Sequence, residues 1–265
     1  MNDKSIQELL ERLDSDDVGR QAKALLDLID AKVYQAAPKI VKLLKSPDID
    51  IRGDAAYALG YVGIHETESV GAALMEILND EDELVISEVV EVLGGLQYTP
   101  AIELIGELLR QDPSPLVRAS AAEALGYLGG AEAIESLELA LRDSDEDESV
   151  RAYAANSLGL LGTNQILSKL ETYVKLEPSL SVKAELLAAR YWLGAKEDIK
   201  QLLSLLNNAD EHLVTLILNI LTDLTERQVP STLHSDAPNI REVLSNIGQR
   251  IPILRPHAEK LMVQA

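Results

Sequence analysis

Hydrophobic and small residues follow a pattern that repeats along most of the chain. The stretch VRASAAEALGYLGG begins at Val117, and close copies of it run from Ile51 to Gly63 and from Val150 to Gly162. Taking the apolar residue that opens each copy as an anchor, successive anchors are separated by 33, 34, 32, 33, 32 and 31 residues. So regular a period indicates stacked structural repeats. The seven anchors are Val18, Ile51, Val85, Val117, Val150, Val182 and Leu213.

Each repeat contains two segments with the periodicity of an amphipathic helix. After the anchor, apolar or small residues fall at positions +4, +7, +8 and +11, which lie on one face of a helix. A second amphipathic segment, such as AIELIGELLR, precedes each anchor. The pattern therefore predicts two antiparallel helices per repeat. For the helix ends it predicts an N-cap at Thr99 and a positive φ at Gly63, Gly129, Gly162 and Gly194.

Small residues at +5 and +9 predict close contact between successive repeats, because a single helix pair cannot cover its own apolar face. The first and sixth repeats differ, with Lys23/Asp27 and Leu187/Tyr191 at these positions. We therefore expect repeats two to five to form a regular body with adapted ends. The body pairs are Ala56/Gly60, Val90/Gly94, Ala122/Gly126 and Ala155/Gly159.

The repeats predict an all-α solenoid over residues 1–224 and a distinct segment over residues 225–265. In that second segment TERQVPSTLHSDAP has the composition of a loop, whereas NIREVLSNIGQ and ILRPHAEKLMVQ have helical patterns. The segment is interpreted either as a helical cap on the exposed end of the array or as a separate docking segment.

The recurring signature VR-x-x-A-A-x-A-L-G-x-L-G, strongest in the second, fourth and fifth repeats, resembles the HEAT-like repeats of the phycobilisome-lyase type. The resemblance implies a right-handed α-solenoid of about seven helix pairs, with the second helix of each pair lining the concave side. Proteins of this type include bilin lyase subunits, metal-dependent hydroxylases, DNA glycosylases and many binding scaffolds. The resemblance is thus specific for fold and leaves several functions open.

Composition narrows these functions. The chain has 265 residues, and it contains neither Phe nor Cys. The core must therefore be aliphatic, and disulfides, thiolate metal sites and thiol nucleophiles are excluded. A cysteine-free chain with no signal-peptide pattern at its start and no run of 18 apolar residues predicts a cytoplasmic protein that does not insert into membranes.

Charge points to the kind of partner. The formal net charge is −20, and since residues 225–265 carry four acids and five bases, residues 1–224 carry −21. Such a surface repels phosphate backbones, so nucleic acid is not expected as a partner. It favours solubility and would steer a basic partner.

The sequence offers no complete catalytic or metal motif. HETES, from His65, lacks the second His of H-E-x-x-H, and the hydroxylase ligand positions hold Gly53-Asp54, Ala119-Ser120 and Ala152-Tyr153 instead of His-Glu pairs. Asp143, Asp145 and Asp147 alternate as in a calcium loop, but the required Gly and final carboxylate are missing. We therefore expect no enzyme activity, no cofactor and no metal.

The face opposite the predicted core, at +3, +6 and +10, carries five of the nine aromatic residues among carboxylates. Exposed Tyr and Trp ringed by charge are typical of protein-binding surfaces, so we predict a scaffold that binds a basic or extended segment of another protein. Alternatively, Tyr61 and Tyr127 only pack over the next repeat. Two other functions remain open: a bilin lyase subunit or chromophore-handling factor, and an enzyme using Glu88 and Glu91. The candidate binding residues are Asp54, Tyr57, Tyr61, Glu88, Glu91, Glu123, Tyr127, Tyr153, Asn156, Glu185 and Trp192.

Overall fold

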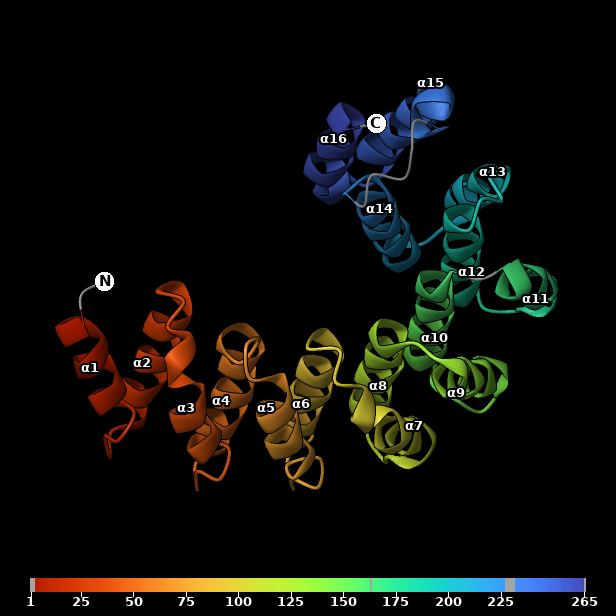
Figure 1. The fold of residues 1–265 in the computed structure, drawn as a ribbon. Helices are drawn as coiled ribbons and strands as arrows, with labels where there is room; N and C mark the ends of the chain where they lie inside the picture. The colour runs from red at the N-terminus through yellow and green to blue at the C-terminus, as the bar shows by residue number, and fades with distance from the viewer. Residues whose placement is uncertain (1–2, 163, 227–231, 265) are drawn as a thin grey trace. The chain divides into compact units, whose positions relative to one another are not determined.

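The protein consists of α-helices joined by short turns (Figure 1). The computed structural model describes residues 3–162, 164–226 and 232–264, and within these ranges it contains sixteen α-helices and no strand. The chain divides into two compact units, Met1–Asp143 (unit 1) and Ser144–Ala265 (unit 2).

Unit 1 is built from two rows of helices. In Figure 1, α2, α4, α6 and α8 lie side by side, and α3, α5, α7 and α9 form the second row. Short 3-10 turns, Tyr34–Ala36 and Thr99–Ala101, lead into α3 and α7. The helices are α1 (Asp3–Arg12), α2 (Val18–Asp30), α3 (Ala37–Leu43), α4 (Ile49–Val62), α5 (Thr67–Met75), α6 (Glu83–Gly95), α7 (Ile102–Gln111), α8 (Pro115–Leu128) and α9 (Ala131–Arg142).

Unit 2 continues the same pairing. Helix α10 packs on α12 and α12 packs on α14, while α11 and α13 contact α12 from the second row. Short 3-10 turns, Leu206–Asn208 and Pro252–Leu254, follow α13 and precede α16. The helices are α10 (Glu148–Leu161), α11 (Asn164–Leu176), α12 (Leu180–Trp192), α13 (Asp198–Leu205), α14 (Glu211–Glu226), α15 (Thr232–Arg250) and α16 (Arg255–Gln264).

The predicted core face of the second helix of each pair is confirmed. On α8, Ala121, Ala124 and Leu125 are all buried, as are the anchors Ile51 and Val117. Serial burial of small and aliphatic side chains on stacked helix pairs is the core of an α-solenoid. The all-α solenoid of helix pairs is therefore the fold of this chain.

The predicted first anchor is wrong. Val18 is 38% exposed, and Ala24 and Leu28, expected on the open face, are fully buried. The cause lies in the helix start: Asp17 is the N-cap of α2 and accepts the N–H of Arg20. In α4 the corresponding bond runs from the Ile51 N–H to Asp48, so Arg20 takes the place of the anchor in the first repeat.

The small residues at +9 do bring neighbouring helices together. A Cβ on Gly94 would lie 2.8 Å from the Cα of Ala124, and one on Gly159 would lie 2.9 Å from the Cα of Ala189. Such distances leave no room for a side chain, so glycine permits these backbones to pack at α6–α8 and α10–α12. The prediction of close inter-repeat contact is confirmed at these interfaces.

Two predicted helix-end features are wrong. Gly63 has a φ of −83°, and it is needed because a Cβ there would lie 2.5 Å from the Leu59 carbonyl oxygen. Thr99 makes no capping bond, since it is the first residue of a 3-10 turn. The predicted positive φ is confirmed at Gly129, Gly162 and Gly194.

Basic residues that follow the anchors are tied to the turns between repeats. Nε and Nη2 of Arg52 donate to both carboxylate oxygens of Asp80, at 2.7 and 2.8 Å, and this lowers the pKa of Asp80. In unit 2, Nη2 of Arg151 donates to Oε2 of Glu177. A bidentate pair such as Arg52–Asp80 fixes the geometry of its turn. The acidic turns therefore have structural roles.

The C-terminal segment is more helical than its composition predicts. Helix α15 begins at Thr232, inside the stretch expected to be a loop, while residues 227–231 lie outside the described residues. Farther along, α15 and α16 pack on each other, and α16 packs on α14. Their buried side chains are Ile240, Leu244, Ile247, Ala258 and Leu261. A domain border at residue 224 stays a prediction.

Candidate interaction surface

The predicted open face of unit 1 lies on α4, α6 and α8. Three of its tyrosines are half exposed: Tyr57 is 41%, Tyr61 50% and Tyr127 45% accessible to solvent. Asp54 and Glu91 are exposed beside them, and Glu88 and Glu123 are partly buried. We call these residues the unit 1 stripe: Asp54, Tyr57, Tyr61, Glu88, Glu91, Glu123 and Tyr127.

The tyrosines of the stripe are held by local contacts. On α4 the hydroxyls of Tyr57 and Tyr61 lie 3.0 Å apart, with ring centroids 5.0 Å apart and planes tilted by 57°. On α8 the hydroxyl of Tyr127 donates to Glu123 at 3.3 Å. Both pairs join residues four apart, which face each other on a helix. The rings are therefore positioned before any partner arrives.

The carboxylates of the stripe repel one another. Burial raises the pKa of Glu88 to about 7, and the charges of Glu91 and Asp54 contribute in the same direction. Burial also raises the pKa of Asp54, together with the charges of Asp50 and Asp48. Like charges that lack a cation raise each other's pKa. A positively charged group placed here would relieve that repulsion.

A buried serine pair supports the stripe from below, and the sequence pattern missed it. Ser120, expected on the open face, is only 5% exposed. Its Oγ lies 2.7 Å from Ser87 Oγ and donates to Glu91 Oε1 at 2.9 Å. These bonds link α6 to α8 and orient Glu91. A polar residue at the buried +2 position of the third repeat, Ser87, was the available signal.

Unit 2 carries a second group of candidate residues on α10 and α12. Tyr153 is 45% exposed, whereas Glu185 is 9% exposed and accepts a hydrogen bond from Asn156 Nδ2 at 3.1 Å. Trp192 is partly buried and packs against the core of this unit. We call these four residues the unit 2 stripe. Within it, Tyr153 is the side chain that is plainly open.

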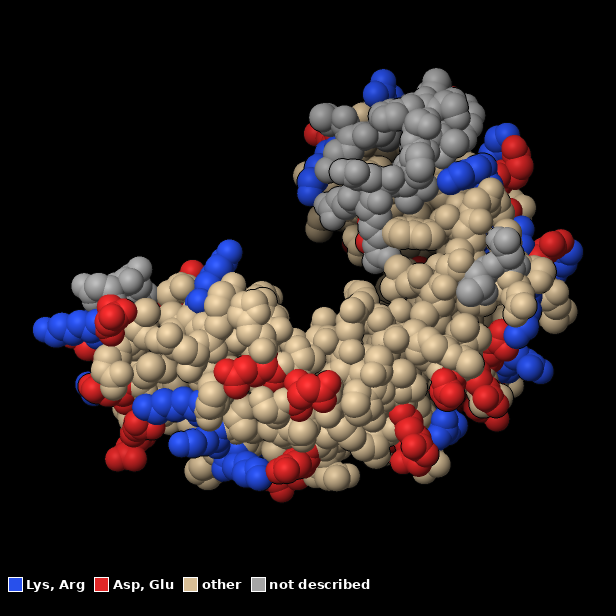
Figure 2. Space-filling view, in the orientation of Figure 1, with Lys and Arg blue, Asp and Glu red and all other residues tan. Residues whose placement is uncertain are grey.

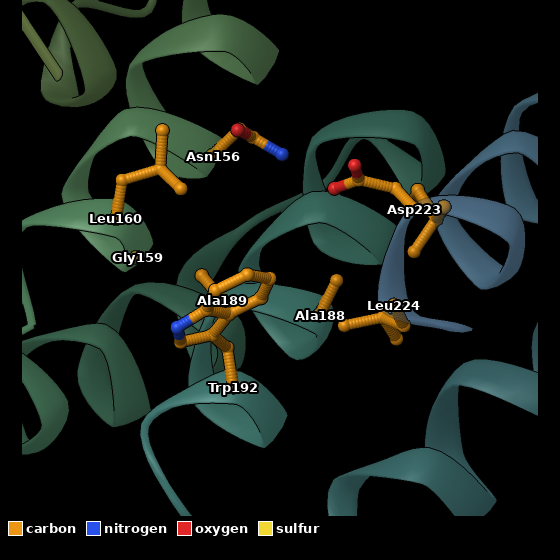
Figure 3. Close-up of a pocket in the computed structure, with 9 residues that line it drawn as sticks. Asn156, Gly159, Leu160, Ala188, Ala189, Trp192, Asp223 and Leu224 are labelled. Carbon is orange, nitrogen blue, oxygen red and sulfur yellow. The ribbon is translucent and has the colours of Figure 1, made fainter. Parts of the chain in front are cut away.

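A small pocket lies next to Trp192 in unit 2 (Figure 3). The side chains of Asn156, Trp192 and Asp223 surround it, and Leu160 and Leu224 contribute apolar walls. Its volume is about 20 Å³, which is room for roughly one water molecule. As it stands the pocket can accept the tip of a side chain but not a large ligand.

Among the described residues, no group of three or more His, Cys, Asp or Glu is arranged to hold a metal ion. His65 lies in the turn after α4, where its ring meets that of Tyr34 edge-on with centroids 4.5 Å apart. Asp147 caps α10 by accepting the N–H of Ser149. Among all residues that the structure describes, no helix is long and apolar enough to cross a bilayer.

The second row of unit 1 has a different surface. In Figure 2, both acidic and basic side chains lie along the edge formed by α3, α5 and α7. Mixed charges of this kind are typical of an ordinary solvated surface. The stripe differs because its charged residues are carboxylates and its apolar content is aromatic.

Comparison with known proteins agrees with this architecture. The family profile described as HEAT repeats matches residues 71–148, which run from within α5 to the start of α10. Over these residues the chain is similar to HEAT-like repeat proteins. A search among proteins of curated function found no match.

Several solved structures share the fold. A chain of the CpcE–CpcF complex of phycocyanin lyase from Nostoc sp. PCC7120 is 19% identical, with a TM-score of 0.58 over 86% of this chain and 92% of that one. YibA of E. coli is 18% identical, with a TM-score of 0.55 over 100% and 93%. A chain of the Kap95p–RanGDP structure is 13% identical, with a TM-score of 0.54 over 93% of this chain and 38% of that one. At these identities the likeness concerns the fold alone.

Proposed function

We propose that this HEAT-like repeat protein is a non-catalytic scaffold that binds a partner protein through its stripes, with a basic, extended segment of the partner lying across the unit 1 stripe. One observation carries the proposal. Tyr57, Tyr61 and Tyr127 stand 41–50% exposed beside carboxylates on helices whose opposite faces form the core. Each ring exposes apolar surface that a partner could cover, and tyrosine is enriched where proteins bind one another.

The chemistry of the stripe favours a cationic guest. A Lys or Arg side chain between the tyrosines would neutralise Glu88 and Glu91 and lie near an aromatic face. Packed helices are about 8–10 Å apart, and a segment in the polyproline II conformation advances about 9 Å in one turn of three residues, so that every third side chain points the same way. A segment with Lys or Arg at every third residue would therefore meet α4, α6 and α8 in turn.

Protein partners occur among the structural neighbours. Two of those structures are complexes, one of CpcE with CpcF and one of Kap95p with RanGDP. Those assemblies belong to those proteins, and for this chain they support only the general idea of a protein partner. The cysteine-free sequence is compatible with a reducing compartment, and we propose that the interaction takes place in the cytoplasm.

A chromophore-handling role is the second candidate, since the fold is shared with a chain of a phycocyanin lyase complex and since Trp192 could stack on a tetrapyrrole. We favour the scaffold because the pocket beside Trp192 is far smaller than a tetrapyrrole. Titration with a bilin, followed by visible absorbance, separates the two roles. A flat difference spectrum supports the scaffold, and a shifted band that Trp192→Ala removes supports the chromophore role.

Partner capture tests the scaffold directly. The tagged wild-type protein and the variant Tyr57→Ala/Tyr61→Ala/Tyr127→Ala are used to purify partners from the source cells, and bound proteins are identified by mass spectrometry. The control is Leu104→Ser/Leu139→Ser, which changes exposed residues of α7 and α9. We expect wild type and control to capture the same partner and the tyrosine variant to lose it. Equal capture by all three would overturn the proposal.

A further inference from the structure

The edge of unit 1 at which α4, α6 and α8 begin carries a second regular feature. Each helix exposes one aliphatic side chain in its first turn: Ile49 is 43%, Leu84 65% and Leu116 40% exposed. We call these three residues the aliphatic row. Isolated exposed aliphatic residues are common on proteins, whereas the same feature at the start of three successive helices forms a repeated surface.

Contacts between the helices show that the members of the row are neighbours. Arg52, three residues after Ile49, pairs with Asp80, four residues before Leu84. Ser87, three residues after Leu84, lies 2.7 Å from Ser120, four residues after Leu116, measured between the Oγ atoms. The first turns of α4, α6 and α8 therefore lie side by side. With packed helix axes about 8–10 Å apart, Leu84 and Leu116, each one residue before its anchor, face the same way at that interval, and Ile49, two residues before its anchor, extends the row one step farther around α4.

The surroundings of the row are acidic. Asp50 is exposed beside Ile49, and Glu81 and Glu83 are exposed near Leu84. The nearby guanidinium groups are turned into the loops: Arg52 is 8% exposed on Asp80, and Arg118 donates to the carbonyl oxygens of Asp112 and Pro113. A partner that approaches this edge meets three aliphatic side chains, of which Ile49 and Leu84 are flanked by exposed carboxylates.

We propose that the aliphatic row docks an amphipathic helix of a partner protein, one that carries Lys or Arg along both sides of its apolar face. A helix advances about 10.5 Å in seven residues, so apolar residues at i, i+7 and i+14 match the interval of the row. Basic flanks complement Asp50, Glu81 and Glu83, and they would give the complex its specificity. The site shares no residue with the stripes, so it extends the protein's interactions beyond the proposed function.

Two synthetic helices test this site by fluorescence anisotropy. Each is about 20 residues long, so that it spans the row, and each has Leu at i, i+7 and i+14. One has Lys on its flanks and the other has Glu. They are titrated with the wild-type protein, the row variant Ile49→Ser/Leu84→Ser/Leu116→Ser, the control Leu104→Ser/Leu139→Ser, and the tyrosine variant of the unit 1 stripe. Circular dichroism confirms that each variant is folded.

We expect wild type, control and tyrosine variant to bind the Lys helix alike and to leave the Glu helix unbound. The row variant should bind the Lys helix about tenfold more weakly or worse, since it loses three apolar contacts at the centre of the interface. Wild-type affinity in the row variant, equal binding of both helices, or binding of neither would overturn the proposal. So would a wild-type dimer that the row variant loses, because a second copy would then cover the row.

Discussion

Helix α4 of unit 1 and helix α12 of unit 2 both carry a tyrosine near their C-terminal end, with opposite results. Tyr61 on α4 is 50% exposed, whereas Tyr191 on α12 is completely buried. Counted from the anchors Ile51 and Val182, Tyr61 stands at +10 and Tyr191 at +9. One residue turns the side chain by about 100° around the helix. That single step separates the face that packs from the face that is open.

The difference shows what the +9 position does. In the regular repeats it is glycine, and the neighbouring backbone lies against it, as Ala124 does against Gly94. On α12 the same place holds Tyr191, in one core with Leu218 and Leu221 of α14, while Lys196 Nζ lies 4.5 Å from the ring centroid. At +9, therefore, the regular repeats have glycine, which lets neighbouring helices touch, whereas the sixth repeat has a large side chain that fills the core. Position +10 is half exposed on α4, where it holds Tyr61, and partly buried on α12, where it holds Trp192.

The largest expected effect comes from exchanging the two tyrosines for alanine. Tyr191→Ala should lower the free energy of unfolding by about 3–5 kcal/mol, because it leaves a cavity in the core of unit 2. Tyr61→Ala should change that free energy by less than about 0.5 kcal/mol, since its ring is half exposed. Urea denaturation followed by circular dichroism measures both. Similar losses for the two variants would contradict the contrast between +9 and +10.

A glycine pair sharpens the same contrast within α6. Gly94→Ala should lower the free energy of unfolding by about 1–3 kcal/mol, because the new methyl group would overlap Ala124 and force the helices apart. Gly95→Ala is the matched control, since a Cβ there has nothing within 4 Å, and it should raise stability by up to about 1 kcal/mol through helix propensity. The same denaturation curves give both signs. A stabilising Gly94→Ala would show that close approach is not required.

The smallest effect concerns pH and the open face. The Glu88 carboxyl has an ordinary pKa of 4.5 in the unfolded chain and one of about 7 in the folded chain. The folded state therefore binds more protons between these values, and the stability from this group falls as pH rises through that window. Glu88→Gln should be more stable than wild type at pH 8 and about equal to it at pH 4.

Thermal melts at the two pH values measure this difference, and Glu107→Gln, a change at an exposed position on α7, serves as the control. The charges of Asp54 and Glu91 also raise the pKa of Glu88. Because that raised pKa is already removed in Glu88→Gln, the stability of the double variant Glu88→Gln/Glu91→Gln should differ from wild type with pH no more strongly than that of the single variant. If the melting temperature changes between pH 4 and pH 8 by the same amount in Glu88→Gln as in wild type, the Glu88 carboxylate is not destabilised in the folded stripe.

Periodicity predicted the repeats because the core position is apolar in almost every copy. It failed in the first repeat, where Asp17 is the N-cap of α2 and the residue three positions later, which corresponds to the anchor, is the polar Arg20. The N-cap residue identifies the anchor position better than hydrophobicity does: Asp48 stands three residues before Ile51, and Ser179 three residues before Val182. Aligning the repeats on their N-caps would have placed Ala24 and Leu28 in the core.

The open face was predictable in outline, because helical geometry alone places position +10 on the side of the helix opposite the core position +8. The burial of Glu185 and Ser120 was not, since each depends on a hydrogen bond to the neighbouring helix, from Asn156 in one case and to Glu91 in the other. The start of α15 at Thr232 was missed for a related reason. Its first residues have loop-like propensities, and the packing of Ile240 and Leu244 farther along holds the helix.

In the proposed scaffold, the unit 1 stripe binds a basic, extended segment through its tyrosines and carboxylates. The most direct test is the dissociation constant of a labelled, unstructured peptide with Lys at every third residue, measured by anisotropy at low and at physiological salt. We expect saturable binding that weakens with salt and is lost in Tyr57→Ala/Tyr61→Ala/Tyr127→Ala but kept in Leu104→Ser/Leu139→Ser. The same dissociation constant for wild type and the tyrosine variant would contradict it.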